Sequence, residues 1–157
     1  MAILKVARLG HPVLRQEAGK VAARQVKKPE MRGLIGDMIE TMREYVGVGL
    51  AAPQVHVSVR VFVMQIDPDD ESTLYVAVNP VVTPLGEEEK EEWEGCLSVP
   101  DMHGRVSRPL RVRLDALDEE GRAYSVEFED FAARVCQHEA DHLDGVVFLD
   151  RMDNLST

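Results

Sequence analysis

The sequence predicts an α+β fold, in which helices precede and follow a run of antiparallel strands. An apolar stripe at helical spacing begins after Pro29, β-rich and alternating runs fill the middle of the chain, and a second helical pattern lies between Asp130 and Gly145. With 157 residues, 45% hydrophobic and 29% charged, the chain has the size and composition of an ordinary globular domain. We therefore expect a single domain over residues 1–157.

Helical elements are expected in the N-terminal part of the chain. Gly10-His11-Pro12 should turn into a short helix, because proline suits the first helical position. After Pro29, apolar residues recur every three or four positions, namely Leu34, Ile35, Met38, Ile39 and Met42. This spacing places them on one face that packs on the core, and Gly47 and Gly49 are expected to end the helix.

The middle of the chain is expected to form strands. Residues 59–64 and 74–78 are rich in β-branched and aromatic side chains, and Asn79-Pro80 is expected to close the second of these runs. The acidic run 87–92, interrupted by Lys90, should be an exposed strand edge.

A hairpin and a final helix are expected near the C-terminus. Residues 111–117 alternate between polar and apolar side chains, and residues 118–121 predict a turn into a second alternating strand over 124–128. Asp130 is a candidate N-cap for the last helix, and Gly145 is expected to terminate it.

The charge balance argues against a nucleic-acid partner. The 28 acidic and 18 basic residues give a net charge of −10, whereas nucleic-acid binders neutralise phosphates with lysine and arginine. Four scattered arginines are expected at solvated strand and loop positions: Arg105, Arg108, Arg111 and Arg113. No segment carries the ~20 apolar residues that cross a bilayer, and the first ten residues show no export signal. We therefore expect no membrane partner and a cytoplasmic protein.

The strongest local pattern is His138-Glu139-Ala140-Asp141-His142. Residues four apart on a helix lie on one face with Cβ atoms about 5–6 Å apart, so both imidazoles can reach one metal ion. Glu139 can then lie beside a metal-bound water. An exposed polar helix is the alternative.

A metal ion needs at least a third ligand, because catalytic zinc sites use three protein ligands and keep a position for water. The candidates are Cys96, Cys136, His11, His56 and His103. Cys136 lies about 200° around the helix from His138, so it should point away from the metal and behave as a small buried residue. His11 and His56 are expected at loop or surface positions, and spacing alone leaves the third ligand open.

Residues 47–54, Gly-Val-Gly-Leu-Ala-Ala-Pro-Gln, form a third segment of interest. Two glycines let a backbone approach a ligand closely, and the small alanines leave room behind it. The segment lacks the third glycine of a dinucleotide loop and the Lys-Ser/Thr pair of a phosphate loop. A tight turn into a strand is the alternative.

Together, three segments resemble the signatures of the peptide deformylase family. These signatures are a Gly-x-Gly-Leu-Ala-Ala-x-Gln loop, a Glu-Gly-Cys-Leu-Ser segment and a QHExDH helix, which match residues 47–54, 94–98 and 137–142 in the family's order. The resemblance extends from Pro12 to about Arg151. It implies a fold in which antiparallel strands pack around a central C-terminal helix that carries the HExxH motif.

The resemblance also implies a role for individual residues. Cys96, His138 and His142 would hold the metal ion, and Glu139 would be the catalytic acid and base. Gln54, with the backbone N–H of Leu97, would stabilise the oxyanion. The substrate's methionine side chain would be surrounded by Val48, Gly49, Phe131 and Val135. Glu94 and Arg108 would form a structural pair behind the site, whereas His56 and Asp130 stand where the family commonly has glycine.

The activity implied by the resemblance is hydrolytic removal of the formyl group from N-terminal formylmethionine of new polypeptides. One divalent metal ion is expected, Fe²⁺ in the cell, with Zn²⁺ or Ni²⁺ as alternatives in purified protein. A zinc peptidase shares the His-Glu-x-x-His pattern but rarely uses a cysteine such as Cys96, and a non-catalytic metal-stabilised binding module is the alternative from another class.

The expected partners are N-formylmethionyl peptides. Some family members dock on the ribosome through a longer basic C-terminal helix, and this sequence has no basic residue after Arg151. We therefore expect weak or no direct ribosome binding.

Overall fold

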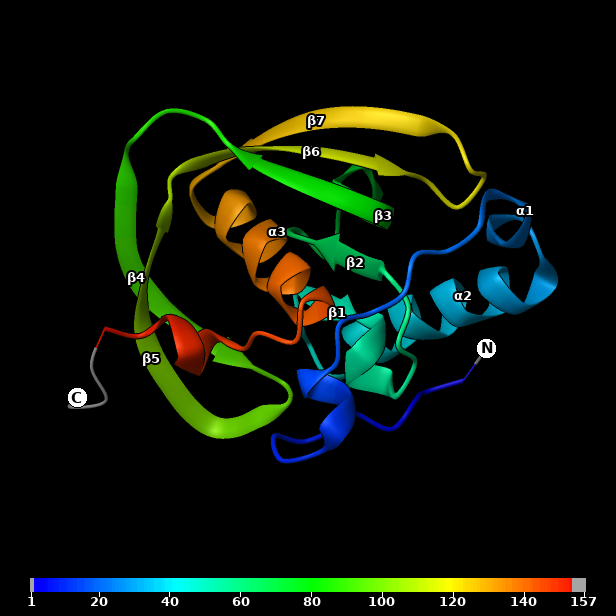
Figure 1. Ribbon diagram of the computed structural model, residues 1–157, viewed down its shortest axis with the longest axis horizontal. Helices are drawn as coiled ribbons and strands as arrows, with labels where there is room; N and C mark the ends of the chain where they lie inside the picture. The colour runs from blue at the N-terminus through cyan, green and yellow to red at the C-terminus, as the bar shows by residue number, and fades with distance from the viewer. Residues whose placement is uncertain (1, 154–157) are drawn as a thin grey trace.

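The computed structural model describes residues 2–153, and Figure 1 shows its helices and strands. The helical elements are η1 (Pro12–Arg15), α1 (Ala23–Val26), α2 (Pro29–Glu44), η2 (Ala52–Val55), η3 (Glu71–Thr73), α3 (Asp130–Leu143) and η4 (Phe148–Arg151). The strands are β1 (Gly49–Ala51), β2 (Val61–Gln65), β3 (Leu74–Pro84), β4 (Glu89–Cys96), β5 (Val99–Pro109), β6 (Arg111–Leu117) and β7 (Ala123–Glu129).

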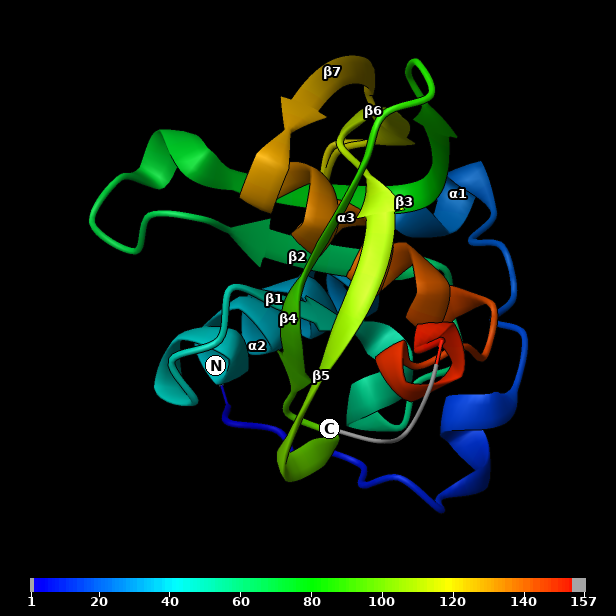
Figure 2. The same cartoon turned by 90° about the vertical axis from the view of Figure 1, so that its left-hand side faces the viewer.

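The strands form two antiparallel sheets. Five of them pair in the order β1-β2-β3-β6-β7, and β4 and β5 form a separate hairpin. In Figure 2 this hairpin lies in front of α3, while the larger sheet covers other sides of the same helix. The predicted α+β fold, with antiparallel strands around a central C-terminal helix, is confirmed.

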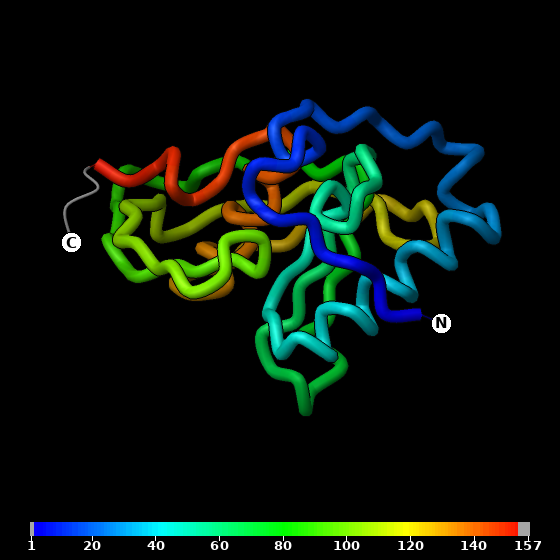
Figure 3. The backbone as a smooth tube through the Cα atoms, turned by 90° about the horizontal axis from the view of Figure 1, so that it is seen from below, coloured from blue at the N-terminus to red at the C-terminus, as the bar shows by residue number. Residues whose placement is uncertain are grey.

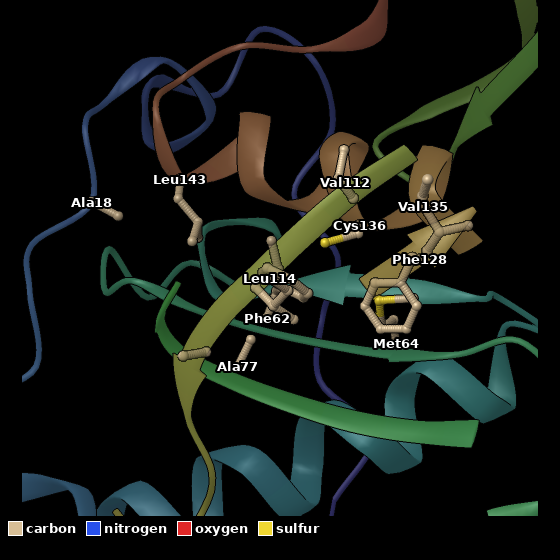
Figure 4. Packing of buried hydrophobic residues seen from close by; sticks show 13 residues of the cluster. Ala18, Phe62, Met64, Ala77, Val112, Leu114, Phe128, Val135, Cys136 and Leu143 are labelled. Atoms are coloured by element: carbon tan, nitrogen blue, oxygen red, sulfur yellow. The ribbon is translucent and has the colours of Figure 1, made fainter. Parts of the chain in front are cut away.

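Helix α3 packs on the larger sheet through apolar side chains. Ala133, Cys136 and Leu143 on the helix are fully buried, and they share one cluster with Phe62 and Leu114 of the sheet. Figure 4 shows Cys136 beside Leu114, on the side of the helix that faces the strands. Burying a leucine such as Leu143 contributes roughly 1.5–3 kcal/mol, so the packing favours one rotation of α3 about its axis.

Helix α2 forms as its apolar stripe predicts. Ile35, Met38 and Met42 are buried and pack against the other face of the sheet in a second cluster. The helix ends at Glu44, before Gly47.

Two local predictions were wrong. Strand β3 does not end at Asn79-Pro80 but continues to Pro84, because a bulge between Val78 and Val81 absorbs the left-handed backbone of Asn79 (φ 51°). Asp130 is not the N-cap of α3: that position is Glu129, and Asp130 has a left-handed φ of 52°.

The acidic run 87–92 is exposed, as predicted, and most of it lies in β4. None of the helices in residues 2–153 is long and apolar enough to cross a membrane. The expectation about the chain's tail concerns residues that, apart from Asp153, lie outside the described range.

The N-terminal segment is hydrogen-bonded to two loops that are far apart in the sequence. The N–H of Ala7 donates to the carbonyl of Gln54 at 2.7 Å, and the N–H of Leu9 donates to that of Ser98 at 2.8 Å. Figure 3 shows this segment crossing the molecule between the N-terminus and the β4–β5 hairpin. It therefore ties the segment around Gln54 to the start of β5.

Candidate metal centre and active site

The three predicted metal ligands lie together. The possible ligand atoms of Cys96, His138 and His142 lie within 4.8 Å of one another, and no other such group of His, Cys, Asp and Glu occurs within residues 2–153. Cys96 Sγ is 3.4 Å from Nε2 of His142. The two histidines lie on adjacent turns of α3. Cys96 is the last residue of β4, which places it beside them.

The other candidates for the third ligand lie elsewhere. Cys136 is buried in the apolar core, where burial raises the pKa of its thiol to about 12. His11 and His56 are exposed and in edge-to-face contact with each other, with ring centroids 4.8 Å apart. His103 packs against Gly95 at the edge of the cavity described below.

One carboxylate orients His138. Nδ1 of His138 donates to Oε1 of Glu94 at 2.8 Å, which leaves Nε2 of the same ring for a metal ion. This carboxylate–imidazole arrangement is typical of metal sites, where it fixes the tautomer and the direction of the ring. Glu94 lies in β4, two residues before Cys96, so one strand supplies a ligand and the partner of another.

Two arginines hold Glu94 in turn. Arg108 donates to both carboxylate oxygens, from Nε at 2.6 Å and from Nη2 at 3.0 Å, and Arg134 donates to Oε2 at 2.6 Å. Burial raises the pKa of Glu94, but the hydrogen bonds from His138 and Arg108 outweigh it and lower the pKa to about 2. Arg108 is only 4% exposed, so the prediction of a solvated position was wrong for this arginine.

The charged network continues behind the helix. Arg108 Nη1 donates to Asp141 at 2.9 Å, and Arg151 donates to the same carboxylate from Nη2 at 2.8 Å and Nε at 3.1 Å. Sequence reasoning missed the roles of Arg134 and Asp141. Asp141 lies between the two histidines of the motif, and this position could have indicated a role at the site. No motif in the local sequence indicates a role for Arg134.

Glu139 is buried beside the three ligands. Its side chain is 4% exposed, and burial raises its pKa to about 7. Its Oε2 has no hydrogen-bond partner within the described part of the protein. A Cβ atom on Gly49 would lie only 2.5 Å from Oε1 of Glu139. The Glu139 carboxylate can therefore occupy this position only because residue 49 is glycine.

The donor set fits a divalent cation. Burial, followed by the positive charges of His138 and Arg108, keeps the pKa of His142 well below its ordinary value, so its ring is neutral and has a lone pair to donate. Burial also lowers the pKa of His138, but its hydrogen bonds to Cys96 and Glu94 raise it to about 10. The three ligand atoms lie close enough together to share one ion, and one sulfur with two imidazoles suits zinc, iron or nickel.

Gln54 directs its amide group toward Cys96. Its Oε1 accepts from the N–H of Ala51 at 2.9 Å, and its Nε2 donates to Ser98 Oγ at 3.1 Å and to Cys96 Sγ at 3.4 Å. The side chain is 1% exposed and therefore has a fixed orientation. Leu97 directly follows Cys96 at the end of β4.

A cavity of about 930 Å³ opens onto this group. A volume of this size is typical of pockets that enclose a small ligand or part of a peptide. The predicted substrate-binding residues all line it: Val48, Gly49, Phe131 and Val135. So do Gln54, Cys96, Leu97, His138 and Glu139.

Comparison with known proteins agrees with this geometry. A sequence model described as polypeptide deformylase matches residues 3–157. The peptide deformylase of Fusobacterium nucleatum is 43% identical over 154 residues, which cover 98% of this chain and 86% of that protein. The chain belongs to the peptide deformylase family.

Solved structures of deformylases share the fold. The class I type b peptide deformylase from Acinetobacter baumannii, crystallised with Met-Ala-Ser, has a TM-score of 0.89 and 36% identity, covering 96% of this chain and 98% of that one. The deformylase from Thermotoga maritima has a TM-score of 0.89 and 37% identity, with 97% and 99% coverage. The protein is therefore an enzyme that acts on peptides and hydrolytically removes the formyl group from N-terminal formylmethionine. The family and the Cys96, His138 and His142 group together support the presence of a single metal ion.

Proposed function

We propose that Cys96, His138 and His142 hold the catalytic ion, and that Glu139 transfers the proton during deformylation. The observation that supports this most directly is the buried carboxylate of Glu139 beside the three ligands, with one oxygen left unpartnered by the described residues. A buried acid with a pKa of about 7 can accept and release a proton near neutral pH.

The reaction needs an activated water, a proton carrier and stabilisation of the developing negative charge. When bound, a divalent ion supplies Lewis-acid chemistry that polarises the formyl oxygen and acidifies a water. Glu139 takes the proton from the attacking water and later delivers it to the leaving amine. The amide group of Gln54 and the backbone N–H of Leu97 stabilise the negative charge that develops on the formyl oxygen.

The same proposal assigns the methionine side chain to the apolar part of the cavity. Val48 and Val135 line its inner wall and Phe131, which is 53% exposed, lies nearer the entrance. Gly49 lines the cavity, and because it has no side chain of its own, its backbone can approach the substrate closely. Glu94 and Arg108 act at a distance, by holding His138 in place.

For the metal we propose Fe²⁺ in the cell, with Zn²⁺ or Ni²⁺ in purified samples. Affinity alone favours the later metals of the series, so availability decides which ion is loaded. Metal analysis of protein purified without oxygen tests this directly.

The test of the proposed function compares Glu139→Gln with the unaltered enzyme on formyl-Met-Ala-Ser and acetyl-Met-Ala-Ser. We expect the variant to retain its metal ion and to lose about 10²- to 10⁴-fold in kcat, the usual range for a general acid or base. The unaltered enzyme should prefer the formyl peptide. Glu40→Gln is a matched control, because Glu40 also has a buried unpartnered Oε2 but lies on α2, outside the cavity.

Three results would contradict the proposal. Near-normal turnover by Glu139→Gln would remove that residue from the chemistry. Cleavage of internal peptide bonds would indicate a peptidase, and full metal content without any hydrolysis would indicate a binding module.

We further propose a cytoplasmic enzyme with weak or no direct ribosome binding and no nucleic-acid or membrane partner. The support is the net charge of −10, since attraction to ribosomal RNA depends on cationic side chains. Co-sedimentation with purified ribosomes should give little bound enzyme, and binding that survives about 0.2 M salt would contradict the expectation.

A further inference from the structure

Val46 has an unusual backbone conformation at the end of α2. Its φ is 55°, in the left-handed region, where a β-branched residue is a clear outlier. The hydrogen bonds explain the geometry: the N–H of Gly47 donates to the carbonyl of Met42 at 2.9 Å, and the N–H of Val46 donates to that of Arg43 at 3.0 Å. This pair of bonds is a Schellman motif, and Val46 occupies the position that is usually glycine.

Packing within the protein does not compensate for this strain. The Val46 side chain is 88% exposed, the largest exposure among the exposed large hydrophobic residues of the described chain. A left-handed conformation costs a residue with a Cβ atom about 1–2 kcal/mol. Both the conformation and the exposure therefore disfavour valine at this position in the free protein.

The location of Val46 suggests what would cover it. Val46 lines the active-site cavity, and so do Tyr45, Trp93 and Phe131. These four make up half of the eight exposed large hydrophobic side chains in residues 2–153. Exposed apolar side chains gathered at one opening are typical of a surface that binds an apolar group.

The loop that carries Val46 has a fixed position relative to the reacting groups. A Cβ atom on Gly47 would lie 3.3 Å from Cδ1 of Leu97, and Gly49 touches Glu139. Since Val46 directly precedes Gly47, its side chain is held at the cavity entrance rather than carried on a free loop. Val46 lines the same cavity as Glu139 and is exposed, so a peptide whose first residue lies beside Glu139 can reach Val46 with its following residues.

We propose that Val46 is a specificity-determining residue, which contacts an apolar side chain downstream of the formylmethionine, at the second or third residue of the substrate. Together with Val46, the other exposed apolar side chains that line the cavity would form this contact surface: Tyr45, Trp93 and Phe131. The inference rests on the proposed function, because it assumes that the first residue of the peptide binds beside Glu139. It adds a preference for apolar residues after the methionine.

The test measures binding and stability separately on the metal-loaded protein. Calorimetry gives the affinity for the unformylated product peptides Met-Gly-Gly, Met-Leu-Gly and Met-Gly-Leu, with the unaltered protein, Val46→Ala and Val46→Gly. Thermal unfolding gives the Tm of the same samples. Val81→Ala is the matched control, because Val81 is also exposed (60%) but lies on β3, away from the cavity.

We expect the two measurements to move in opposite directions for Val46→Gly. Its Tm should rise by about 1–4 °C because the left-handed strain is removed. Its affinity for one of the two leucine peptides should fall about three- to tenfold, as expected for a partly buried valine contact. Affinity for Met-Gly-Gly should not change, and Val46→Ala should lose most of the same leucine affinity.

Either of two outcomes would overturn the proposal. An equal loss for all three peptides would show that residue 46 acts through the shape of the loop, and unchanged affinity for all of them would leave Val46 as a helix cap alone. Product binding needs no turnover, so an inactive unaltered enzyme would refute the proposed function without deciding this test.

Discussion

The two long helices end with the same hydrogen-bond motif but with different residues at its left-handed position. At the end of α3, Val146 donates to the carbonyl of Asp141 at 3.0 Å and Gly145 donates to that of His142 at 3.2 Å. Gly145 has a φ of 74°, close to the 55° of Val46 at the end of α2. The backbone requirement is thus shared, and only the side chain differs.

The surroundings explain the difference. A Cβ atom on Gly145 would lie 2.8 Å from the backbone carbonyl group of Arg15, whereas the Val46 side chain projects into solvent at the cavity entrance. At the end of α3 a side chain is excluded by the fold, and at the end of α2 it is allowed at the cost of strain. Residue choice at α3 therefore follows from packing, and we have argued that at α2 it follows from substrate contact.

The largest effect on stability should come from Gly145→Ala. The new Cβ would collide with the backbone of Arg15, which cannot move aside as a flexible side chain can, and the left-handed strain adds to the collision. We expect the free energy of unfolding to fall by about 3–4 kcal/mol in a urea titration. Gly86→Ala is the control, because Gly86 has a φ of 75° but nothing within 4 Å of its Cβ position.

The control should lose only about 1 kcal/mol, the cost of the conformation itself. Equal losses in the two variants would show that the contact with Arg15 relaxes easily, and the difference between the two helix ends would then need another explanation.

An intermediate effect, on activity more than on stability, is expected for Gly49→Ala. Gly49 has no left-handed φ, so its backbone can hold an alanine, but the Cβ would lie 2.5 Å from Oε1 and 2.8 Å from Cγ of Glu139. Glu139 must then shift, and a displacement of about 1 Å can cost about 10²-fold in rate. We expect a loss of that order in kcat on formyl-Met-Ala-Ser, with the metal ion retained.

Gly47→Ala sharpens this result. Its closest contact would be the end of the Leu97 side chain, at 3.3 Å, which can move by a few tenths of an ångström, and the next, the backbone oxygen of Met42 at 3.5 Å, is at ordinary van der Waals distance. Its loss in kcat should therefore be much smaller. If Gly47→Ala were as slow as Gly49→Ala, the loop as a whole, and not the space beside Glu139, would set the rate.

Periodicity predicted the fold where one face of an element is buried. Helix α2 and the β6–β7 hairpin follow their apolar patterns, because each packs one face on the core. Strand β5 was not predicted: it contains Pro100 and Gly104 and is held by pairing with β4, a contact that no local pattern reveals. The bulge at Asn79 was mistaken for a strand end for the same reason, since a local turn signal was overridden by pairing with the neighbouring strand.

The residues of the site also differ in how far local sequence patterns predicted them. Helical spacing alone placed His138 and His142 on one face, but it could not choose among the cysteines and histidines for a third ligand, because Cys96 comes from a distant strand. Only the resemblance singled out Cys96. Arg134 was missed because its burial depends on Glu94, which is 40 residues away in the sequence.

The smallest effect is expected at the start of α3, where Asp130 has a left-handed φ of 52°. The family commonly has glycine at this position, but aspartate tolerates the conformation better than most residues. Its negative charge in the first turn also favours the helix by roughly 0.3–1 kcal/mol. Asp130→Gly removes both the strain and the charge, so the free energy of unfolding should change by less than about 0.5 kcal/mol.

Asp130→Asn separates the two contributions, because asparagine accepts the left-handed conformation but carries no charge. We expect it to lower the free energy of unfolding by a few tenths of a kcal/mol at low salt, and by less at high salt, where charge–dipole interactions are screened. Urea titrations at two salt concentrations measure this. A large gain in stability for Asp130→Gly would contradict the argument, because it would mean that the start of α3 is strained as strongly as the end of α2.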